Sequence, residues 1–218
     1  MSIEPTQRTR VRRSERASFE RSLIYEVLDG APICHLGFVH DGSPAVVPTI
    51  HARVGGALYL HGSRGTRAMR LPKQGAEVCV EVTLLDGLVL ARSAFHHSMN
   101  YRSVMLFGRA AEVIDRDEMW EASKAVVEHV CPGRWDHIRR PTAKELIKTQ
   151  FLRIPISEAS AKFREGPPVD DDEDYDLEVW AGVVPVRMVY DAAVPDPRLA
   201  PGVAVPAHVE GLRRDIVP

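Results

Sequence analysis

Cysteines and long apolar runs are both scarce in this sequence. The 218 residues include three cysteines, Cys34, Cys79 and Cys131, which are widely spaced and form no C-x-x-C pair. An odd number of isolated cysteines favours reduced thiols, and we therefore expect a cytoplasmic protein. No run approaches the roughly 18 apolar residues that a membrane-spanning helix needs, so we expect no association with a membrane.

An excess of charge of one sign is also missing. The chain has 28 basic and 30 acidic residues, which give a formal net charge of -2. Such a balance produces no overall field that would attract nucleic acid, and we expect no nucleic-acid partner. Arginines cluster within the first 16 residues, but no apolar signal-peptide core follows them and acidic residues interrupt them. We interpret residues 1–15 as a flexible, solvated arm.

The motifs of several enzyme classes are absent. The sequence contains no G-x-G-x-x-G, no G-x-S-x-G and no pair of histidines or cysteines at the spacing of metal ligands. His96 and His97 are adjacent, and neighbouring side chains of an extended segment point in opposite directions, so we expect no metal site. The acidic run at 170–174 lacks the glycine and glutamate of a calcium-binding loop. We interpret it as a solvated loop because adjacent like charges repel each other.

Short apolar segments separated by Asp-Gly and Gly-Gly turns are abundant, and they predict antiparallel strands. Pro48 requires an edge or a bulge in its strand, Asp86-Gly87 predicts a hairpin turn, and Gly108 predicts a bend. The predicted strands cover residues 33–39, 45–54, 57–61, 77–84, 88–91, 101–114, 151–156 and, less regularly, 177–190. The predicted helices cover residues 18–28 and 67–71, and two more begin after the N-cap residues Asp115 and Thr142. A mainly β chain with peripheral helices is the expected fold class.

Three segments have residue types suited to ligand binding. A strand ending at the turn His61–Thr66 and followed by a helix would direct free backbone N–H groups at one point, which suits a phosphate; an ordinary N-capped helix start is the alternative. The segment Ser93–Ser103 is rich in hydroxyl groups and histidines, which suits a polar ligand or simply a surface loop. Trp180 precedes two small residues, so its ring belongs either to the core or against a cofactor.

The three segments occur together in an order that resembles the FMN-binding split-barrel proteins related to pyridoxamine 5'-phosphate oxidase. The resemblance covers about Arg16 to Val189, and it is closest to the flavin-nucleotide-binding branch that includes the nitroimidazole-resistance proteins. It implies a six-stranded antiparallel split β-barrel with peripheral helices over residues 16–190, followed by an extended tail over residues 191–218. It also implies a homodimer with FMN at the subunit interface.

The resemblance also implies which residues bind the cofactor. The family's isoalloxazine ring lies along the segment that matches Val47, Pro48 and Thr49. The ribityl chain and phosphate follow the segment that matches the turn, and a basic residue at the position of Arg67 pairs with the phosphate. The full set of implied cofactor-binding residues is Val47, Pro48, Thr49, His61, Gly62, Ser63, Thr66, Arg67, Tyr101, Arg102, Ser103 and, across the interface, Trp180.

The expected function is that of an FMN oxidoreductase that passes electrons from a reduced nicotinamide to a small organic acceptor. His61 and His97 are the candidate catalytic residues because histidine can transfer protons near neutral pH. The Arg/His substrate signature of true pyridoxamine phosphate oxidases is not found in the tail, which argues against vitamin B6 oxidation. Two alternatives remain. One is a flavin-binding protein without turnover, suggested by the missing substrate signature. The other is a haem- or deazaflavin-binding relative, with haem suggested by the histidines at 96–97.

Overall fold

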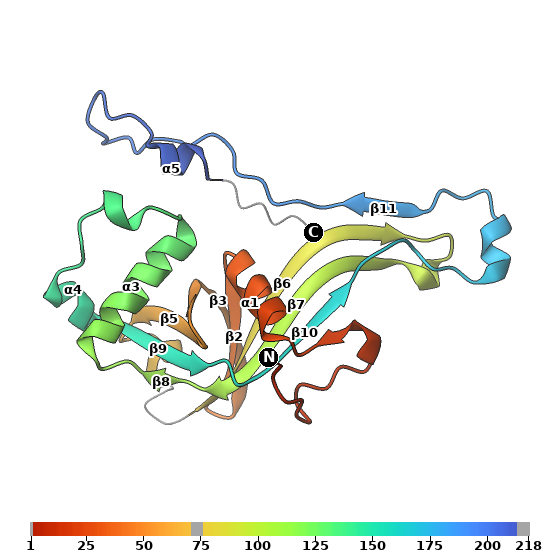
Figure 1. Ribbon diagram of the computed structural model, residues 1–218, viewed down its shortest axis with the longest axis horizontal. Coiled ribbons are helices and arrows are strands. Elements are labelled where there is room, and N and C mark those ends of the chain that lie inside the picture. Colours follow the sequence, from red (N-terminus) through yellow and green to blue (C-terminus); the bar gives the residue numbers. More distant parts are fainter. Residues whose placement is uncertain (1, 71–75, 213–218) are drawn as a thin grey trace.

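Two antiparallel sheets enclose one apolar core in this computed structural model, which describes residues 2–70 and 76–212 (Figure 1). The first sheet has the order β1 (Ala17–Ser18), β10 (Glu158–Arg164), β7 (Ser98–Arg109), β6 (Glu77–Leu90), β2 (Cys34–His40) and β3 (Ser43–Thr49), with β11 (Gly182–Pro185) also paired to β6. The second has the order β4 (His51–Val54), β5 (Ala57–Ser63), β9 (Thr149–Pro155) and β8 (Ala111–Glu112).

The core lies between the facing sides of the two sheets. Leu36, Val80 and Leu106 of the first sheet and Leu60 and Ile154 of the second belong to one buried cluster. Burying such side chains contributes roughly 1.5–3 kcal/mol each, which makes this cluster the main source of stability. The mainly β split-barrel prediction is confirmed, although the described strands outnumber six and the two sheets do not form one closed ladder.

The described helices are α1 (Arg21–Gly30), α2 (Arg67–Arg70), α3 (Arg116–Val130), α4 (Ala143–Lys148) and α5 (Ala207–Glu210). Most of them lie against the outside of the barrel, whereas α5 lies in the tail beyond β11 (Figure 1). The N-cap predictions are confirmed: the Asp115 side chain accepts a hydrogen bond from Glu118 N, and Thr142 forms a capping box with Glu145. None of the described helices is long and apolar enough to cross a membrane. Leu71, the predicted end of α2, and residues 213–218 of the predicted tail lie outside the described residues.

The predicted hairpin at Asp86-Gly87 is wrong. β6 continues through both residues, with a β-bulge between Leu85 and Gly87, and pairs with β7 on both sides of it. β2 pairs with β6 only at residues 78–81, whereas β11 pairs with residues 87–90 of the same strand. The long strand is therefore stabilised by two different neighbours along its length, which an Asp-Gly pair alone does not reveal.

Three other strand predictions change in detail. The predicted strand 45–54 is divided at Ile50 into β3 and β4, which belong to different sheets, and Pro48 lies in the edge strand β3 as expected. β7 ends just after Gly108, and the chain then enters the second sheet as β8. β10 was not predicted, and of the predicted strand 177–190 only β11 forms.

The acidic run at 170–174 is not entirely solvated. The Asp170 side chain is fully buried and accepts hydrogen bonds from the backbone N–H groups of Arg92 (3.0 Å) and Ser93 (3.3 Å). It also pairs with the Arg92 guanidinium at 3.1 Å. These donors compensate the buried carboxylate, so one member of the run anchors the chain beside the end of β6.

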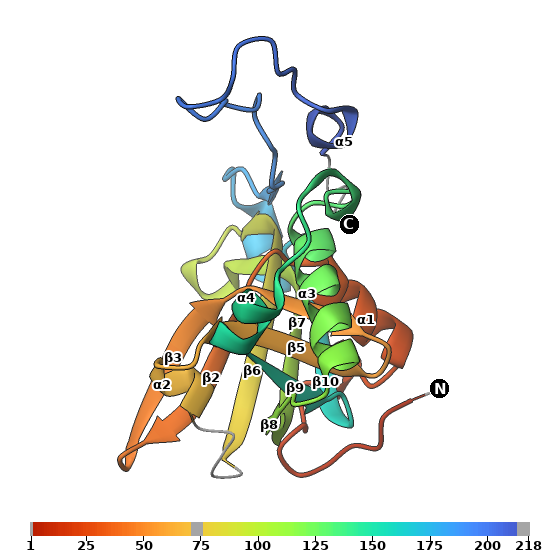
Figure 2. The ribbon, with the colours of Figure 1, turned by 90° about the vertical axis from the view of Figure 1, so that its left-hand side faces the viewer.

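The two ends of the described chain differ in their packing. Near the N-terminus, Ile3 is buried in the core, and Arg8 contacts both Glu158 and Glu77. The sequence did not predict this packing of the arm. Beyond β11 the chain is mostly extended and projects from the barrel before α5 (Figures 1 and 2). The domain boundaries at residues 15 and 190 stay predictions.

Candidate functional site

The turn between β5 and α2 is built by a compact set of hydrogen bonds. The carbonyl oxygen of Ser63 accepts from the N–H and the hydroxyl of Thr66, both at 3.0 Å. The carbonyl oxygen of Thr66 in turn accepts from Met69 N and Arg70 N at 3.2 Å. The local sequence therefore forms the strand, turn and helix that the pattern predicts, because each of these bonds joins residues a few positions apart.

The cationic side chains of this turn are not equivalent. Arg64 is engaged, since it bonds to Glu112 at 2.8 Å and to the carbonyl oxygen of Ile147 at 2.7 Å. Arg67 is exposed and forms no ion pair with any carboxylate in the described part of the chain. Gly62 provides room for α2, because a Cβ there would lie 3.0 Å from the Met69 side chain. Arg67 is thus a cation at the turn that remains available to an anion.

The end of β3 lies near this turn. α2 packs against β2, which is the direct neighbour of β3 (Figure 2). Val47 is half-buried and packs on the main core, whereas Pro48 is exposed on the sheet edge and Thr49 ends the strand. The structure therefore groups the predicted segment 47–49 with the predicted turn at one end of the barrel.

The third predicted segment lies elsewhere. Tyr101, Arg102 and Ser103 are on β7, and β6 and β2 separate this strand from β3. The Arg102 guanidinium forms a two-pronged ion pair with Asp86, at 3.0 and 2.8 Å, and this partner raises the pKa of Arg102. Within one chain, Arg102 is therefore already neutralised and is not brought to the turn.

The two candidate catalytic histidines come from different places. His61 lies on the side of the second sheet that faces α3 and α4, beside the Phe151 ring and in a cavity of about 160 Å³. Its Nδ1 atom is buried without a hydrogen-bond partner, and burial lowers the pKa of His61, which favours the neutral ring. His97 is exposed just before β7, with its Nδ1 atom 2.9 Å from the Ser93 carbonyl oxygen. The structure does not bring the two together.

Trp180 is an exposed residue just before β11. Its side chain is two-thirds exposed, at 66%, and its ring lies against Gly182, where a Cβ would come within 3.0 Å of the ring. Its small neighbour therefore allows the ring to lie close to the backbone. A planar apolar group in this exposed position is suited to cover another flat surface.

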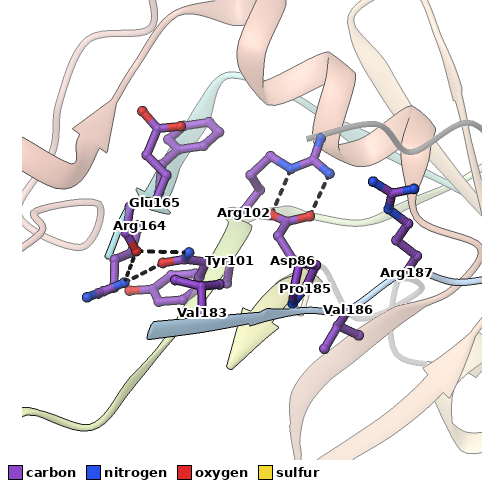
Figure 3. A pocket seen from close by; sticks show the side chains of 12 residues that line it. Asp86, Tyr101, Arg102, Arg164, Glu165, Val183, Pro185, Val186 and Arg187 are labelled. Atoms are coloured by element: carbon purple, nitrogen blue, oxygen red, sulfur yellow. Dashed lines mark hydrogen bonds and ion pairs between the residues drawn. The ribbon is translucent and has the colours of Figure 1, made fainter. Parts of the chain in front are cut away.

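One cavity was not predicted from the sequence. It measures about 350 Å³ and lies between β7, the end of β10 and β11 (Figure 3). Tyr101 and Arg102 line it, and so do Asp86, Arg164 and Arg187. The only sequence signal was the concentration of polar residues near Ser93–Ser103, because the other walls come from segments distant in sequence.

Comparison with known proteins places the fold among flavin proteins. The profile of the family described as pyridoxamine 5'-phosphate oxidase matches residues 20–163. Flavocytochrome Anf3 from Azotobacter vinelandii is 39% identical, with a TM-score of 0.90 over 97% of this chain and 99% of that chain. The FAD- and haem-binding protein from Mycobacterium smegmatis is 38% identical, with a TM-score of 0.86 over 90% of this chain and 96% of that chain.

A more distant structure shows the same fold. A putative 5-nitroimidazole antibiotic resistance protein from Bacteroides thetaiotaomicron is 20% identical, with a TM-score of 0.57 over 67% of this chain and 85% of that chain. At this identity the likeness concerns the fold alone. No curated protein matches the chain.

Proposed function

Because the chain belongs to the pyridoxamine 5'-phosphate oxidase family, we propose that it is a flavin-binding redox protein that passes electrons from a reduced nicotinamide to a small organic acceptor. The observation that carries this proposal is the hydrogen-bonded turn between β5 and α2, next to which Arg67 is exposed and has no carboxylate partner among residues 2–70 and 76–212. The flavin supplies the electron-transfer chemistry, and the protein binds and orients it.

Arg67 is the proposed partner of the cofactor phosphate. A guanidinium can donate two parallel hydrogen bonds to phosphate oxygens, and this one has no competing carboxylate among the described residues. Ser63 and Thr66 present hydroxyl groups at the same turn, and the edge of β3 has backbone groups free to bond the ring's polar rim. These groups bind the FMN portion, which is common to FMN and FAD.

FMN is the cofactor expected from the sequence, whereas two of the similar structures are named for a flavocytochrome and for FAD and haem binding. We keep FMN as the proposal because the resemblance implies it, and the exposed guanidinium of Arg67 suits the phosphate group that FMN and FAD share. Mass spectrometry of the molecule released on denaturation tests this directly, since FMN, FAD and deazaflavin differ in mass.

A homodimer is proposed as the functional form. The segments that the family likeness assigns to the cofactor are divided between the β3–α2 end and β7, and one chain does not bring them together. A second copy would supply the missing half, and β3 offers it an edge strand on which Val46 is 67% exposed. Light scattering after size-exclusion chromatography should give twice the mass of one chain, and a monomer that retains its flavin would contradict the proposal.

The main experiment combines a spectrum with rapid kinetics. The purified protein should show a flavin absorption spectrum, and NADH or NADPH should reduce the bound flavin much faster than free flavin. A colourless protein that also fails to change its tryptophan emission on adding FMN would overturn flavin binding. Bound flavin that is reduced no faster than free flavin would instead identify a binding protein without turnover.

A haem group is the second candidate cofactor, and His61 is the residue that favours it. Its ring faces an apolar cavity whose walls include Val126, Val127 and Phe151, and its Nδ1 atom lacks a partner. The cavity, about 160 Å³, is smaller than the roughly 300–1,000 Å³ typical of ligand pockets, so a haem at His61 would extend beyond it. The histidines at 96–97 fit less well, because His96 pairs with Asp171 at 3.2 Å and His97 is exposed.

Haem titration tests this candidate. A Soret band that is lost in His61→Ala but retained in His97→Ala would support haem ligation by His61. The absence of a Soret band in the wild-type protein would exclude this candidate and would leave flavin binding untouched.

A further inference from the structure

The end of the described tail folds back onto the helical part of the molecule. After β11 the chain is mostly extended, and it then forms α5, which lies over the loop between α3 and α4, residues 131–142 (Figures 1 and 2). The ring of His208, on α5, stacks on the ring of His137, in this loop, with the two centroids 4.3 Å apart and the planes 21° from parallel. This stacked pair joins the tail to loop 131–142.

Loop 131–142 is shaped to receive the His208 side chain. Gly133 has a φ of +79°, a conformation that favours glycine, and a Cβ there would lie only 3.4 Å from the Cβ atom of His208. The Glu128 carboxylate, near the end of α3, fixes the loop by accepting hydrogen bonds from the backbone N–H groups of Gly133 (2.7 Å) and Trp135 (2.8 Å). The loop is therefore a preformed surface on which α5 docks.

The environment of His208 favours its neutral ring. Its Nε2 atom is buried and has no hydrogen-bond partner among residues 2–70 and 76–212. Burial lowers the pKa of His208, the positive charges of His137 and Arg134 lower it further, and Glu128 acts in the opposite direction. A protonated ring carries an N–H at Nε2, and burying this group without an acceptor is unfavourable.

The carboxylates around this contact are committed elsewhere. Both oxygens of Glu128 accept the backbone hydrogen bonds of the loop. Asp136 pairs with Arg140 at 2.9 Å. Glu210 is two residues from His208 on the same helix, and side chains at that spacing do not face each other. A proton on His208 would therefore place a positive charge in the contact that these carboxylates offset only in part.

We propose that the stacked pair of His137 and His208 is a pH-sensitive latch for the tail. Neutral rings hold α5 on loop 131–142, and a proton on His208 releases it. The pairing of β11 with β6 fixes the near end of the tail, and docked α5 fixes the far end. Release therefore frees the extended segment between them while the barrel stays folded.

His208 binds a proton more readily in the released tail than in the docked tail. The released ring has the ordinary histidine pKa of about 6.5, which is higher than the pKa of the docked ring. The released state therefore takes up the proton first, and docking weakens as the pH falls below about 6.5. At pH 5.5 the equilibrium should shift toward release by up to about tenfold.

Amide hydrogen exchange of the full chain at pH 7.5 and 5.5, corrected for intrinsic exchange rates, tests the latch. α5 has four residues, and so short a helix is not stable by itself in water. Protection of the amides of residues 209–212, which donate hydrogen bonds within this turn, therefore reports docking.

We expect these amides to be protected at pH 7.5 and to lose up to about tenfold of their protection at pH 5.5, while β7 stays protected. Equal protection of residues 209–212 at the two pH values, including none at either, would overturn the proposal. A parallel loss across β7 would show that the whole fold opens, and would overturn it as well.

The variant His208→Phe keeps a flat ring on His137 but cannot bind a proton, so residues 209–212 should stay protected at both pH values. The wild-type loss of protection in this variant would assign the titration to another group and overturn the latch. His40→Gln, which changes a half-exposed histidine at the end of β2, is the matched control and should show the wild-type pH dependence.

An NMR titration of His208 in the wild-type protein is a second measurement, which does not depend on how the phenylalanine packs. The pKa of His208 should lie below 6.5, and His137→Phe should raise it because the positive charge of His137 is removed. A wild-type His208 that titrates at 6.5 or above would overturn the proposal. These readouts involve no flavin, so their outcome is independent of the proposed function.

Discussion

Two regions of the molecule present arginines that suit an anionic group, and they differ in what surrounds those arginines. At the turn between β5 and α2, Arg67 is exposed and without a carboxylate among the described residues. On β7, Arg102 is only 13% exposed and is bound by Asp86 at 2.8 and 3.0 Å. A basic residue in a family-like motif is therefore available to a ligand only where the fold has not already paired it.

The largest expected effect comes from removing the ion pair between Arg102 and Asp86. Arg102→Ala leaves the Asp86 carboxylate, itself 13% exposed, without its partner and should lower the free energy of unfolding by about 3 kcal/mol. Denaturant unfolding of Arg102→Ala, Asp86→Ala and the double variant measures this, and the double variant should lose less than the sum of the two. If Arg102→Ala keeps its full stability but loses flavin, Arg102 binds the flavin and does not stabilise the fold, which contradicts the comparison.

The next largest effect is expected at the turn between β5 and α2, where Arg67 is exposed. Arg67→Ala should reduce flavin affinity by roughly tenfold or more and leave the unfolding free energy nearly unchanged, because it removes a charged ligand partner and no core volume. Flavin fluorescence titration measures the affinity. Arg70→Ala is the matched control, since Arg70 is an exposed arginine of the same helix. Equal loss in both variants would mean that only overall charge matters there.

A smaller effect is expected where β11 pairs with β6, at Gly87. A Cβ at Gly87 would lie 3.0 Å from the Val183 side chain and 3.2 Å from the carbonyl oxygen of Val184. Gly87→Ala should therefore weaken the β6–β11 pairing by roughly 1–3 kcal/mol, the usual range for overpacking.

Amide hydrogen exchange at residues 182–185 would report this weakening. Gly56→Ala is the control, since its nearest atom, the Tyr25 hydroxyl oxygen, would be 3.7 Å away. Protection of β11 equal to that of the wild type would show that the bulge tolerates a side chain.

The smallest effect concerns pH. Burial lowers the pKa of His61, so the unfolded chain binds a proton more readily than the folded protein below the ordinary histidine pKa of about 6.5. The unfolding free energy should therefore fall as the pH decreases from 7 to 5, and His61→Gln should show a shallower fall. Denaturant unfolding across this pH range measures both slopes, and identical slopes would mean that His61 is not the titrating group.

The turn between β5 and α2 was predictable because its determinants are local. The backbone and hydroxyl bonds that form it join Ser63 to Thr66, and Thr66 to Met69 and Arg70. The N-cap residues Asp115 and Thr142 were predictable for the same reason. In each case the partner lies three or four residues away, within the range that a sequence pattern covers.

The region around the Arg102–Asp86 ion pair was not predictable, because the residues that determine it are distant in sequence. Asp86-Gly87 has the composition of a hairpin turn, but β7 and β11 pair with the chain on either side and keep it extended. β10 was missed because its buried Ala159 and Ala161 have little intrinsic preference for strands, and the neighbouring strands impose the conformation. That Asp86 neutralises Arg102 depends on this same pairing, since β6 and β7 bring the two side chains together.

The buried carboxylate of Asp170 has a consequence for everything that follows it in the chain. By binding the backbone N–H groups of Arg92 and Ser93, it holds the chain next to the end of β6, where β11 pairs. A four-residue strand on a free peptide would pair only weakly. Fixed at Asp170, the chain has only residues 171–181 left to span before β11 reaches its edge, which lowers the entropy cost of the pairing. A single carboxylate thereby shortens the loop that must close before β11 can pair with β6.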